Sequence, residues 1–526
     1  MIRNILEYLE KAFDRKKTKN AVIDKDRSIS FHDLSIKSKC IAKNILSLNV
    51  ALSKMPIAIF LNKSIECVIA DIGVIYSGNA YMNLDIKTPA QRLKNIIESV
   101  QPAYIVTNDK YKKILLDVCE ENIILNIDEL LCDNAAEIDL QSVRNSMIDT
   151  DPLCLINTSG STGTPKSVVL NHRSFVDFVE WTKDTVEWSD HEIMGSLSPV
   201  IFDIFSFELC MMMAKGSTLV VIDSSLAAFP VKILELLQKE KVSYIFWVPT
   251  IMVNIANMDL LEEISLDTLK MVWFAGEVFP TKKFNYWKKH LPNTRFVNMY
   301  GPIEITLDCT YYPVDREIPD DEPIPIGYPC RNTDILLLDE NDNLVDDGEG
   351  ELCVRGTSLA MGYYNNQEKT AVAFVQNPLH NHYPELIYRT GDIVKYNQCR
   401  ELVFVGRKDS LIKHMGYRIE LSEIEHIIVD TLQLAKNACA VYDYANEMIV
   451  CYYESVQEIS VANFRKNLMK QMPAYMIPTK YIRVDEMPRN PNGKIDRNML
   501  KNTVCEYLNK ISEILPDKNI LLGKKK

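Results

Sequence analysis

Residues 154–172 read Cys-Leu-Ile-Asn-Thr-Ser-Gly-Ser-Thr-Gly-Thr-Pro-Lys-Ser-Val-Val-Leu-Asn-His, and the fold prediction starts from this stretch. The apolar runs Leu153–Ile156 and Val168–Leu170 predict two buried strands joined by a loop. The loop is rich in serine and threonine and contains two glycines and Lys166. Hydroxyl groups, backbone N–H groups and a lysine in such a loop can surround a polyphosphate. The alternative is an ordinary Ser/Thr-rich surface turn, which has the same composition.

The loop differs from the common nucleotide-binding P-loop. That motif has a glycine directly before its Lys-Ser pair, whereas Pro165 precedes Lys166 and Ser167 here. The order Ser-Gly-Ser-Thr-Gly-Thr-Pro-Lys resembles instead the signature loop of adenylate-forming enzymes. The resemblance implies that ATP phosphates are bound by Thr158, Ser159, Gly160, Ser161, Thr162, Gly163 and Lys166.

Length, charge and cysteine pattern restrict the class of protein. A chain of 526 residues exceeds one hydrophobic core, so two or more domains are expected. The longest apolar runs are strand-sized, and Met1–Phe13 predicts an amphipathic helix with acidic residues, so neither a membrane partner nor a secretory signal is expected. The 13 cysteines form no Cys-x-x-Cys pair, which favours reduced thiols and a cytoplasmic location. A formal charge of −12 argues against nucleic acid as the main partner.

Short apolar strands alternate with helical patterns along most of the chain. Strands are predicted at Met55–Phe60, Pro102–Thr107 and Ser217–Asp223, and helices at Ser64–Ser77 and Val231–Lys239. This alternation is typical of parallel sheets covered by helices. The predicted fold class is therefore mixed α/β, with a large N-terminal domain of helix-covered sheets.

The sequence pattern changes from alternating strands and helices to short strands between Glu322 and about Phe404. Short strands punctuated by Gly and Pro predict a mainly antiparallel, β-rich subdomain at about residues 322–405. A domain boundary is expected at Lys408-Asp409, after which the pattern is that of a small, mobile α+β domain. The expected organisation is an N-terminal domain (1–407), a hinge (408–410), a C-terminal lid domain (411–508) and a tail (509–526).

Seven further motifs follow the loop in the order found in adenylate-forming enzymes. They are Phe202-Asp203-Ile-Phe-Ser-Phe-Glu208, Asn298-Met-Tyr300-Gly301-Pro302-Ile303-Glu304, Gly350-Glu-Leu-Cys-Val-Arg-Gly356, Tyr388-Arg-Thr-Gly391-Asp392, Gly406-Arg407-Lys-Asp409 continuing to Leu421, Met472-Pro-Ala-Tyr-Met-Ile-Pro478 and Pro491-Asn-Gly493-Lys494-Ile-Asp496-Arg497. Together they span most of the chain. Within that superfamily the chain looks most like amino-acid adenylation enzymes, namely nonribosomal peptide synthetase adenylation domains and D-alanine–carrier-protein ligases.

The resemblance implies a reaction in two halves. A carboxylate attacks the α-phosphorus of ATP and releases pyrophosphate, and a thiol then takes the acyl group from the mixed anhydride. Attack by one anion on another needs charge neutralisation and alignment, for which Mg²⁺ and a lysine are suited. The sequence contains no Gly-Gly-x-Ser carrier-attachment motif and no condensation-type His-His motif. A free-standing enzyme that loads a separate phosphopantetheinylated carrier protein is therefore expected.

Roles in catalysis and in ATP binding follow from the same resemblance. Lys494 would bridge the substrate carboxylate and the nucleotide; the alternative is a solvated turn lysine. Glu304 would ligate Mg²⁺, a hard cation that prefers oxygen ligands. The residue before it, Ile303, departs from the threonine usual in the family, which removes a hydroxyl group near the α-phosphate. The remaining residues implied in ATP binding are Gly276, Glu277, Asn298, Met299, Tyr300, Gly301, Asp392 and Arg407.

Three of these residues have specific implied contacts. Asp392 would accept hydrogen bonds from both ribose hydroxyls, because a carboxylate has two oxygens. Arg407 would hold ribose or phosphate, and Tyr300 would stack on adenine. The alternatives are a loop salt bridge for Asp392 and Arg407, and an ordinary core tyrosine for Tyr300.

Asp203 separates this chain from relatives that activate fatty or aryl acids. In amino-acid-activating members an aspartate at this place pairs with the α-ammonium group of the substrate. An aspartate before Ile-Phe-Ser-Phe-Glu could also cap a helix. The full set of implied substrate-pocket residues is Asp203, Ile204, Phe207, Phe246, Trp273, Ala275, Met299, Leu307 and Asp308, together with Lys494.

Three large aromatic residues in that set predict a small substrate such as glycine, alanine of either hand, serine or diaminopropionate. Asp308 could accept from a serine hydroxyl or pair with a short side-chain amine, or it could face solvent at the rim. In the family the C-terminal domain swings about a hinge, here Lys408 and Asp409, and brings a loop, here Gly416, to the site for thiolation. The competing functions are an acyl-CoA ligase and a nucleotide-binding regulator that has lost catalysis, the latter supported only by Ile303.

Overall fold

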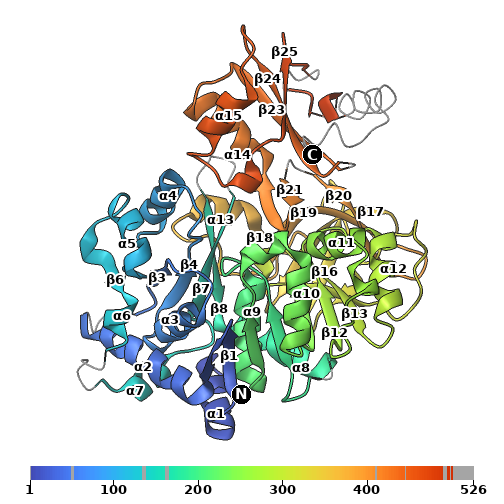
Figure 1. Cartoon of the computed structure of the whole chain (residues 1–526). Helices are drawn as coiled ribbons and strands as arrows, with labels where there is room; N and C mark the ends of the chain where they lie inside the picture. Colours follow the sequence, from blue (N-terminus) through green and yellow to red (C-terminus); the bar gives the residue numbers. More distant parts are fainter. Residues whose placement is uncertain are drawn as a thin grey trace. The chain divides into compact units, whose positions relative to one another are not determined.

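The computed structural model describes residues 2–48, 53–132, 138–159, 165–186, 188–408, 411–444, 446–489, 495–497 and 499–501. It divides into two compact units (Figure 1). The first contains Met1–Lys87, Leu93–Thr158 and Lys166–Asp409. The second contains Thr88–Arg92, Ser159–Pro165 and Ser410–Lys526.

Two mainly parallel sheets form the framework of the first unit. The larger has the strand order β15 (Tyr328–Pro329), β14 (Thr310–Pro313), β13 (Arg295–Tyr300), β12 (Met271–Phe274), β11 (Tyr244–Trp247), β9 (Ile193–Ser196), β10 (Thr218–Val221), β1 (Asn20–Asp24) and β2 (Arg27–Ser30). The smaller has the order β6 (Ile124–Asn126), β5 (Tyr104–Thr107), β3 (Pro56–Ile59), β4 (Ala80–Asn83), β7 (Pro152–Thr158) and β8 (Lys166–Asn171). Parallel strands buried on both faces need continuous apolar sequence, and β3, β4, β10, β11 and β12 are buried along their whole length.

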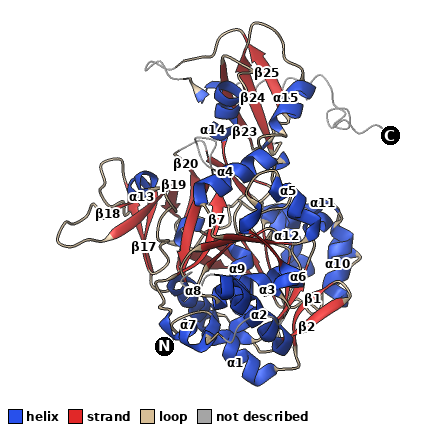
Figure 2. Cartoon of the chain, turned by 90° about the vertical axis from the view of Figure 1, so that its left-hand side faces the viewer, coloured by secondary structure: helices blue, strands red, loops and turns tan. Residues whose placement is uncertain are grey.

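A third, antiparallel sheet completes the first unit. It comprises β16 (Thr333–Leu338), β17 (Glu349–Gly356), β19 (Leu386–Tyr396) and β18 (Phe374–Gln376), with β20 (Leu402–Arg407) paired to β19. The mixed α/β fold expected from the alternating pattern is therefore observed, with strands of the large sheets flanked by helices (Figure 2).

Two helix ends have a clear local cause. Ser64 caps α3 by accepting a hydrogen bond from the Cys67 N–H at 3.3 Å, and Gly216, with φ +62°, ends α9.

The helices are α1 (Leu6–Lys16), α2 (Phe31–Leu48), α3 (Ile65–Tyr76), α4 (Ala90–Val100), α5 (Asp109–Leu116), α6 (Ile127–Leu130), α7 (Leu140–Ser146), α8 (His172–Thr185), α9 (Asp203–Lys215), α10 (Pro230–Lys239), α11 (Pro249–Asn257), α12 (Thr281–His290), α13 (Gln367–Ala373), α14 (Leu421–His426) and α15 (Val461–Leu468).

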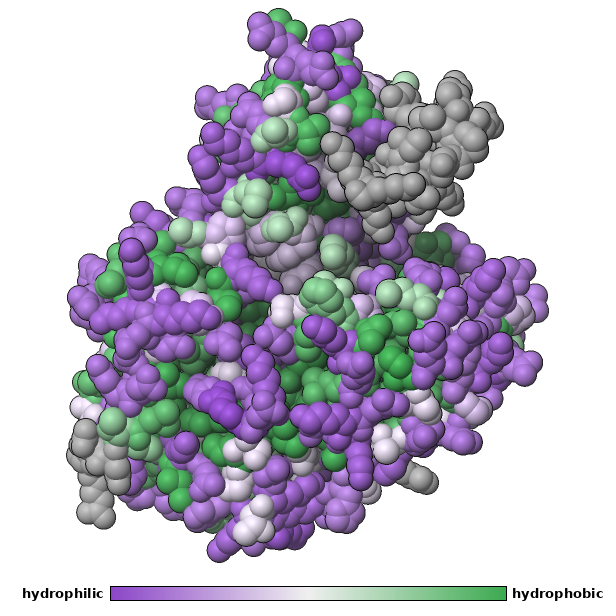
Figure 3. All heavy atoms as spheres, viewed as in Figure 1, coloured by the Kyte–Doolittle hydropathy of each residue, from purple (hydrophilic) through white to green (hydrophobic). Residues whose placement is uncertain are grey.

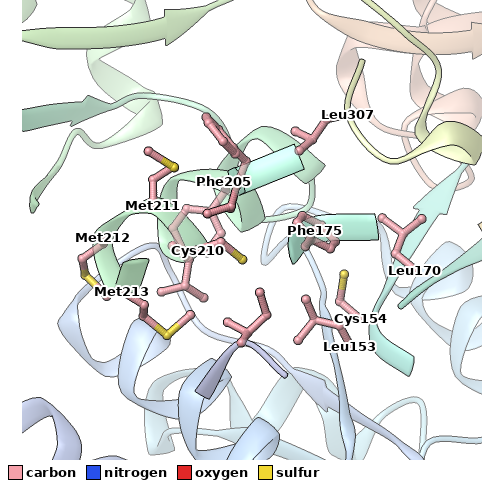
Figure 4. Packing of buried hydrophobic residues seen from close by; sticks show 14 of the residues in the cluster. Leu153, Cys154, Leu170, Phe175, Phe205, Cys210, Met211, Met212, Met213 and Leu307 are labelled. Atoms are coloured by element: carbon pink, nitrogen blue, oxygen red, sulfur yellow. The ribbon is translucent and has the colours of Figure 1, made fainter. Parts of the chain in front are cut away.

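Helix α9 lies in the centre of the main core. It is buried on nearly every side, and its residues Phe205, Cys210 and Met211–Met213 gather around the same space as Leu153, Cys154 and Leu170 of β7, β8 and the residues beside them (Figure 4). A helix that is apolar all round belongs in a core. This position fixes the N-terminal end of α9, where Asp203 lies.

The second unit has its own core. A three-stranded sheet of β23 (Asn437–Asp443), β24 (Met448–Glu454) and β25 (Lys480–Val484) packs with α14 and α15. The hairpin β21 (Leu411–His414) and β22 (Tyr417–Glu420) precedes them. The chain is helical from Leu421 to Thr431: α14 ends at His426, and a π-helical turn continues over Ile427–Thr431.

Polar side chains dominate the face of the molecule in Figure 3, with hydrophobic residues in small scattered groups. Within the described ranges, no helix is long and apolar enough to cross a membrane.

Candidate functional site

Asp203 is the first residue of α9 and is buried. Phe202, not Asp203, occupies the N-cap position. One carboxylate oxygen of Asp203 accepts from the Ile204 N–H at 3.0 Å, and the other accepts from the Leu307 N–H at 3.1 Å. The carboxylate therefore links α9 to the loop after β13 and does not act as the helix cap considered from sequence.

Large aromatic rings of α8, α9 and the large sheet pack against one another and form an aromatic wall. Phe207 stacks on Trp273 with ring centroids 5.7 Å apart, and both make edge contacts with Phe246. Phe246 and Trp273 are paired neighbours on β11 and β12, so their side chains lie on one face of the sheet. Two further rings, Phe178 and Trp181 of α8, pack against Trp273. All five rings are buried.

The loop after β13 approaches the backbone at Gly301 closely. A Cβ atom on Gly301 would lie 2.4 Å from the Leu307 carbonyl oxygen and 2.5 Å from the Asp308 Cα, so only glycine fits there. Thr306 and Leu307 adopt positive φ values of 53° and 68°, which are strained for residues with side chains. Asp308 is 3% exposed, which contradicts the solvent-facing rim position considered from sequence.

Asp392 lies at the centre of a hydrogen-bonded cluster between β19 and β20. The Tyr300 hydroxyl donates to one of its oxygens and the Arg407 guanidinium donates to the other. Arg407 also donates to the Thr390 carbonyl oxygen at 3.1 Å. Burial and the neighbouring Asp392 carboxylate raise the pKa of the Tyr300 phenol, so Tyr300 remains a donor. The ion pair considered from sequence is present, and it joins two paired strands.

Lys408, implied as a hinge residue, is tied to the same sheet. Its backbone N–H donates to the Gly391 carbonyl at 2.8 Å, and its ammonium group lies 3.3 Å from a Glu351 carboxylate oxygen. Glu351 also accepts two hydrogen bonds from Arg389. Burial opposes ionisation of Glu351, but the Arg389 and Lys408 cations outweigh it and lower the pKa of the carboxyl group.

Glu304 is buried and accepts a hydrogen bond from the Tyr363 hydroxyl at 2.8 Å. The Lys166 ammonium lies 5.6 Å from the centre of the Tyr363 ring, a cation–π contact. Tyr363 thus connects the implied metal ligand to the implied phosphate ligand, and sequence reasoning missed it. Its only local signal is an aromatic pair, Tyr363-Tyr364, between a Gly and an Asn.

A single carboxylate is compatible with Mg²⁺ in a nucleotide site, because Mg²⁺ takes its other ligands from phosphates and water. No group of three or more metal-ligating His, Cys, Asp or Glu side chains occurs among the residues the structure describes. Glu304 therefore fits a metal carried by ATP better than a metal held by the protein alone.

The remaining implied ATP residues lie at strand ends of the first unit. Asn298 and Met299 are at the end of β13, and the Asn298 amide donates to the Pro325 carbonyl at 2.8 Å. Glu277 follows Gly276 and accepts from the N–H and hydroxyl of Thr250, at the start of α11. Ala275 and Met299 are buried, and Ile204 is partly buried. Carboxyl ends of parallel strands are the usual ligand sites in such sheets.

Other residues that the resemblance implies for the site lie in the phosphate loop, in the second unit or outside the described residues. The Thr158 hydroxyl donates to the Lys166 carbonyl at 3.4 Å, whereas Ser159 belongs to the second unit and bonds the backbone of Arg418 and Glu420. Gly416, with φ +82°, is the second residue of the two-residue turn Met415-Gly416 in the β21–β22 hairpin. Gly160, Ser161, Thr162, Gly163, Asp409 and Lys494 lie outside the described residues.

Comparison with known proteins gives a consistent result. Residues 9–364 match the family model described as AMP-binding enzyme. Zwittermicin A synthase ZmaJ of Bacillus cereus is 30% identical over 489 residues, which are 91% of this chain and 91% of that protein. Tyrocidine synthase 1 of Brevibacillus parabrevis is 30% identical over 488 residues, which are 91% of this chain but 43% of that protein. The chain thus spans less than half the length of the latter relative.

Solved structures share the fold. The Vibrio cholerae adenylation domain AlmE, in complex with glycyl-adenosine-5′-phosphate, superposes with a TM-score of 0.82 at 18% identity, covering 96% of this chain and 98% of that one. The artificially fused adenylation–PCP di-domain NpsA-ThdA from Klebsiella oxytoca gives 0.78 at 21%, covering 91% and 94%. The o-succinylbenzoate CoA synthetase MenE of Bacillus subtilis gives 0.80 at 19%, covering 95% and 98%.

Proposed function

The chain belongs to the family of AMP-binding enzymes, and from this premise we propose that it activates a small amino acid as aminoacyl-AMP. Pyrophosphate is the other product of this half-reaction. In the second half-reaction the aminoacyl group passes to the phosphopantetheine thiol of a carrier protein.

One observation carries the proposal: a buried carboxylate at the start of α9 stands beside a wall of large aromatic rings. Asp203 offers a negative charge to an α-ammonium group in a place where an unpaired charge would be unfavourable. Phe207, Phe246 and Trp273 already pack against one another and limit the room for a side chain. A fatty or aryl acid has no ammonium group to pair with Asp203.

The residues around Asp392 supply the nucleotide side of the site. Asp392 is held in place by Arg407 and Tyr300 and can accept from ribose hydroxyls through its remaining lone pairs. Lys166 offers a positive charge to phosphate oxygens. Lys494 is proposed to neutralise the carboxylate and α-phosphate as the new bond forms.

Bound Mg²⁺ would neutralise phosphate charge, with Glu304 as its protein ligand. The Tyr363 hydroxyl orients the Glu304 carboxylate by donating to one of its oxygens, so the other oxygen keeps a defined direction. Ile303, which replaces the usual threonine, packs against the main core.

The thiol acceptor is proposed to come from outside these 526 residues, because the sequence has no Gly-Gly-x-Ser attachment motif. The resemblance to carrier-loading adenylation enzymes supports a carrier thiol. The fold shared with a CoA synthetase keeps free CoA as the second candidate acceptor.

The test is ATP–pyrophosphate exchange with a panel of acids: glycine, both alanines, serine and diaminopropionate beside leucine, phenylalanine, octanoate and benzoate. We expect exchange with at least one small amino acid and none with octanoate or benzoate. Exchange with octanoate or benzoate and with no amino acid would refute the proposal. In the second step, radiolabelled amino acid is offered to a phosphopantetheinylated carrier or to CoA, and preferential labelling of CoA would select the alternative.

A further inference from the structure

The first unit contains a cavity of about 600 Å³ between α1, α8 and the C-terminal end of α9. Charged residues line it, among them Lys11, Arg15, Lys16, Glu180, Lys183 and Lys215, and apolar side chains make up part of the lining. A second cavity of about 480 Å³ adjoins it and shares Arg15 and Lys16. These volumes are those of ordinary small-molecule sites, which span about 300–1,000 Å³.

The two cavities are strongly basic in a protein of net charge −12. Seven lysine or arginine side chains line them against three carboxylates. Two of those carboxylates are already neutralised, because Glu180 lies 2.9 Å from the Lys183 ammonium and Asp190 lies 3.4 Å from that of Lys16. A surplus of positive charge therefore remains inside a concave surface, where the potential is focused.

Two of the cations are available to a ligand. Lys11 and Arg15 lie four residues apart on α1, so they project from the same side of the helix on successive turns. Both are exposed, and neither forms a hydrogen bond or ion pair with any residue in the described part of the chain. A lysine and an arginine at this spacing can donate hydrogen bonds to the oxygens of one phosphate group or of two linked phosphates.

The walls of the cavity are held in place before any ligand binds. The Lys19 ammonium donates to the Gly216 carbonyl at 2.6 Å and to the Asp190 carbonyl at 3.0 Å, and Lys16 donates to the same Asp190 carbonyl at 2.8 Å. The Lys19 contact with Gly216 lies at the C-terminal end of α9, where the helix dipole favours a positive charge. Burial and the nearby Lys16 cation lower the pKa of Lys19 to about 8, in agreement with unrelieved positive charge here.

We propose that this basic cavity binds a small phosphate-bearing molecule, with Lys11 and Arg15 as its principal ligands. The site is distinct from the proposed amino-acid site. Lys215, at the last residue of the 13-residue helix α9, lines the cavity, whereas Asp203 is the first residue of that helix, so about 18 Å of helix separates them.

The experiment is calorimetric titration of inorganic pyrophosphate into three forms of the full chain. These are the wild type, Lys11→Glu/Arg15→Glu, and the matched control Lys282→Glu/Lys283→Glu on α12, which removes the same charge away from the cavity. Pyrophosphate binding at the catalytic site is common to all three. We expect the wild type and the control to show a second class of sites, weakened at least tenfold in the Lys11/Arg15 variant.

Each other result overturns the proposal. Identical isotherms for the three proteins would show that the cavity binds no phosphate compound. An equal loss in the control variant would show a general charge effect. A phosphate group could also come from a lipid, so the wild type and the Lys11/Arg15 variant are both sedimented with phosphatidylcholine vesicles with and without phosphatidic acid. Pelleting with phosphatidic acid that depends on Lys11 and Arg15 would assign the surface to a membrane and refute the small-molecule site. Melting temperatures within about 2 °C of wild type are the folding control, as expected for exposed side chains.

Discussion

The Asp203 carboxylate accepts a hydrogen bond from the Leu307 backbone N–H at 3.1 Å, and Leu307 holds a positive φ of 68°. The proposed counter-charge for the substrate therefore also fixes the strained loop that carries two implied pocket residues, Leu307 and Asp308. Mutations of Asp203 should separate the effect of its negative charge from the effect of its hydrogen bond to the loop.

Asp203→Asn keeps an oxygen that can accept from Leu307 but removes the charge, whereas Asp203→Ala removes both. Leaving a buried ammonium without its partner costs about 3–5 kcal/mol. We expect kcat/KM for the preferred amino acid to fall on the order of 10²-fold or more in both variants, with a lower melting temperature mainly in Asp203→Ala. The measurement is ATP–pyrophosphate exchange beside a thermal melt. Unchanged kcat/KM in Asp203→Asn would remove the counter-charge role.

Trp273→Ala should admit larger substrates. Trp273 contacts Phe207, Phe246 and the rings of α8, so its removal opens space in the wall and destabilises the fold by about 3–5 kcal/mol. Exchange with leucine or phenylalanine should rise relative to alanine. Trp247→Ala is the matched control, because Trp247 is equally buried but belongs to a different core cluster. Equal substrate profiles in the two variants would show that Trp273 does not line the pocket.

Gly301→Ala should destabilise the protein and reduce activity together. The new Cβ would lie 2.4 Å from the Leu307 carbonyl oxygen, so backbone must move, at a cost of about 1–3 kcal/mol. Gly406→Ala is the control, because no atom lies within 4 Å of the corresponding Cβ position. Melting temperature and exchange rate are measured on both. A Gly301→Ala variant as stable as Gly406→Ala would contradict the close approach.

His172 should make stability depend on pH. It is buried and accepts a hydrogen bond from the Ile5 N–H at 3.3 Å, and burial lowers its pKa from 6.5 to about 4. Between pH 4 and 6.5 the His172 imidazole binds a proton more readily in the unfolded chain than in the folded one. The contribution of His172 to the free energy of unfolding is therefore fully present above pH 6.5 and is lost as pH falls toward 4. The loss amounts to about 3 kcal/mol at pH 4. Denaturant unfolding between pH 4.5 and 7 should show a steeper decline for wild type than for His172→Gln. The control His382→Gln, at an exposed position, should decline like wild type; equal slopes in all three would contradict this assignment.

Lys494→Ala tests the proposed division of the two half-reactions. Adenylate formation should be almost abolished, because the charge that balances carboxylate and phosphate is lost. Transfer from preformed aminoacyl-adenylate to a carrier thiol should stay nearly intact. If Lys494 only stabilises its domain, both steps will fall together with the melting temperature, and that result would exclude the catalytic role.

Local patterns predicted the elements well, and long-range contacts less well. The helix predicted over Ser64–Ser77 is observed as α3, Ile65–Tyr76, and Ser64 caps its start. The family resemblance of the motifs is confirmed. Tyr363, in contrast, meets Glu304 across 59 residues of sequence, and no periodicity or spacing indicates that contact.

The aromatic wall also shows that contacts between distant parts of the chain are hard to predict from sequence. The resemblance implied that Phe207, Phe246 and Trp273 belong to one pocket, and the structure shows that their rings contact one another. The contributions of Phe178 and Trp181 were not predicted, because they depend on how α8 packs against the sheet. The change from α-helix to a π-helical turn after His426 was not predicted either.

The most direct test of the central claim is the fate of carboxylate oxygen. Glycine, alanine or serine, whichever supports exchange, is labelled with ¹⁸O in both carboxylate oxygens and incubated with ATP, enzyme and carrier. If the carboxylate attacks the α-phosphorus of ATP, transfer to the thiol must leave one ¹⁸O atom in AMP, which mass spectrometry detects. AMP without ¹⁸O, or ¹⁸O in inorganic phosphate together with ADP, would contradict the aminoacyl-adenylate.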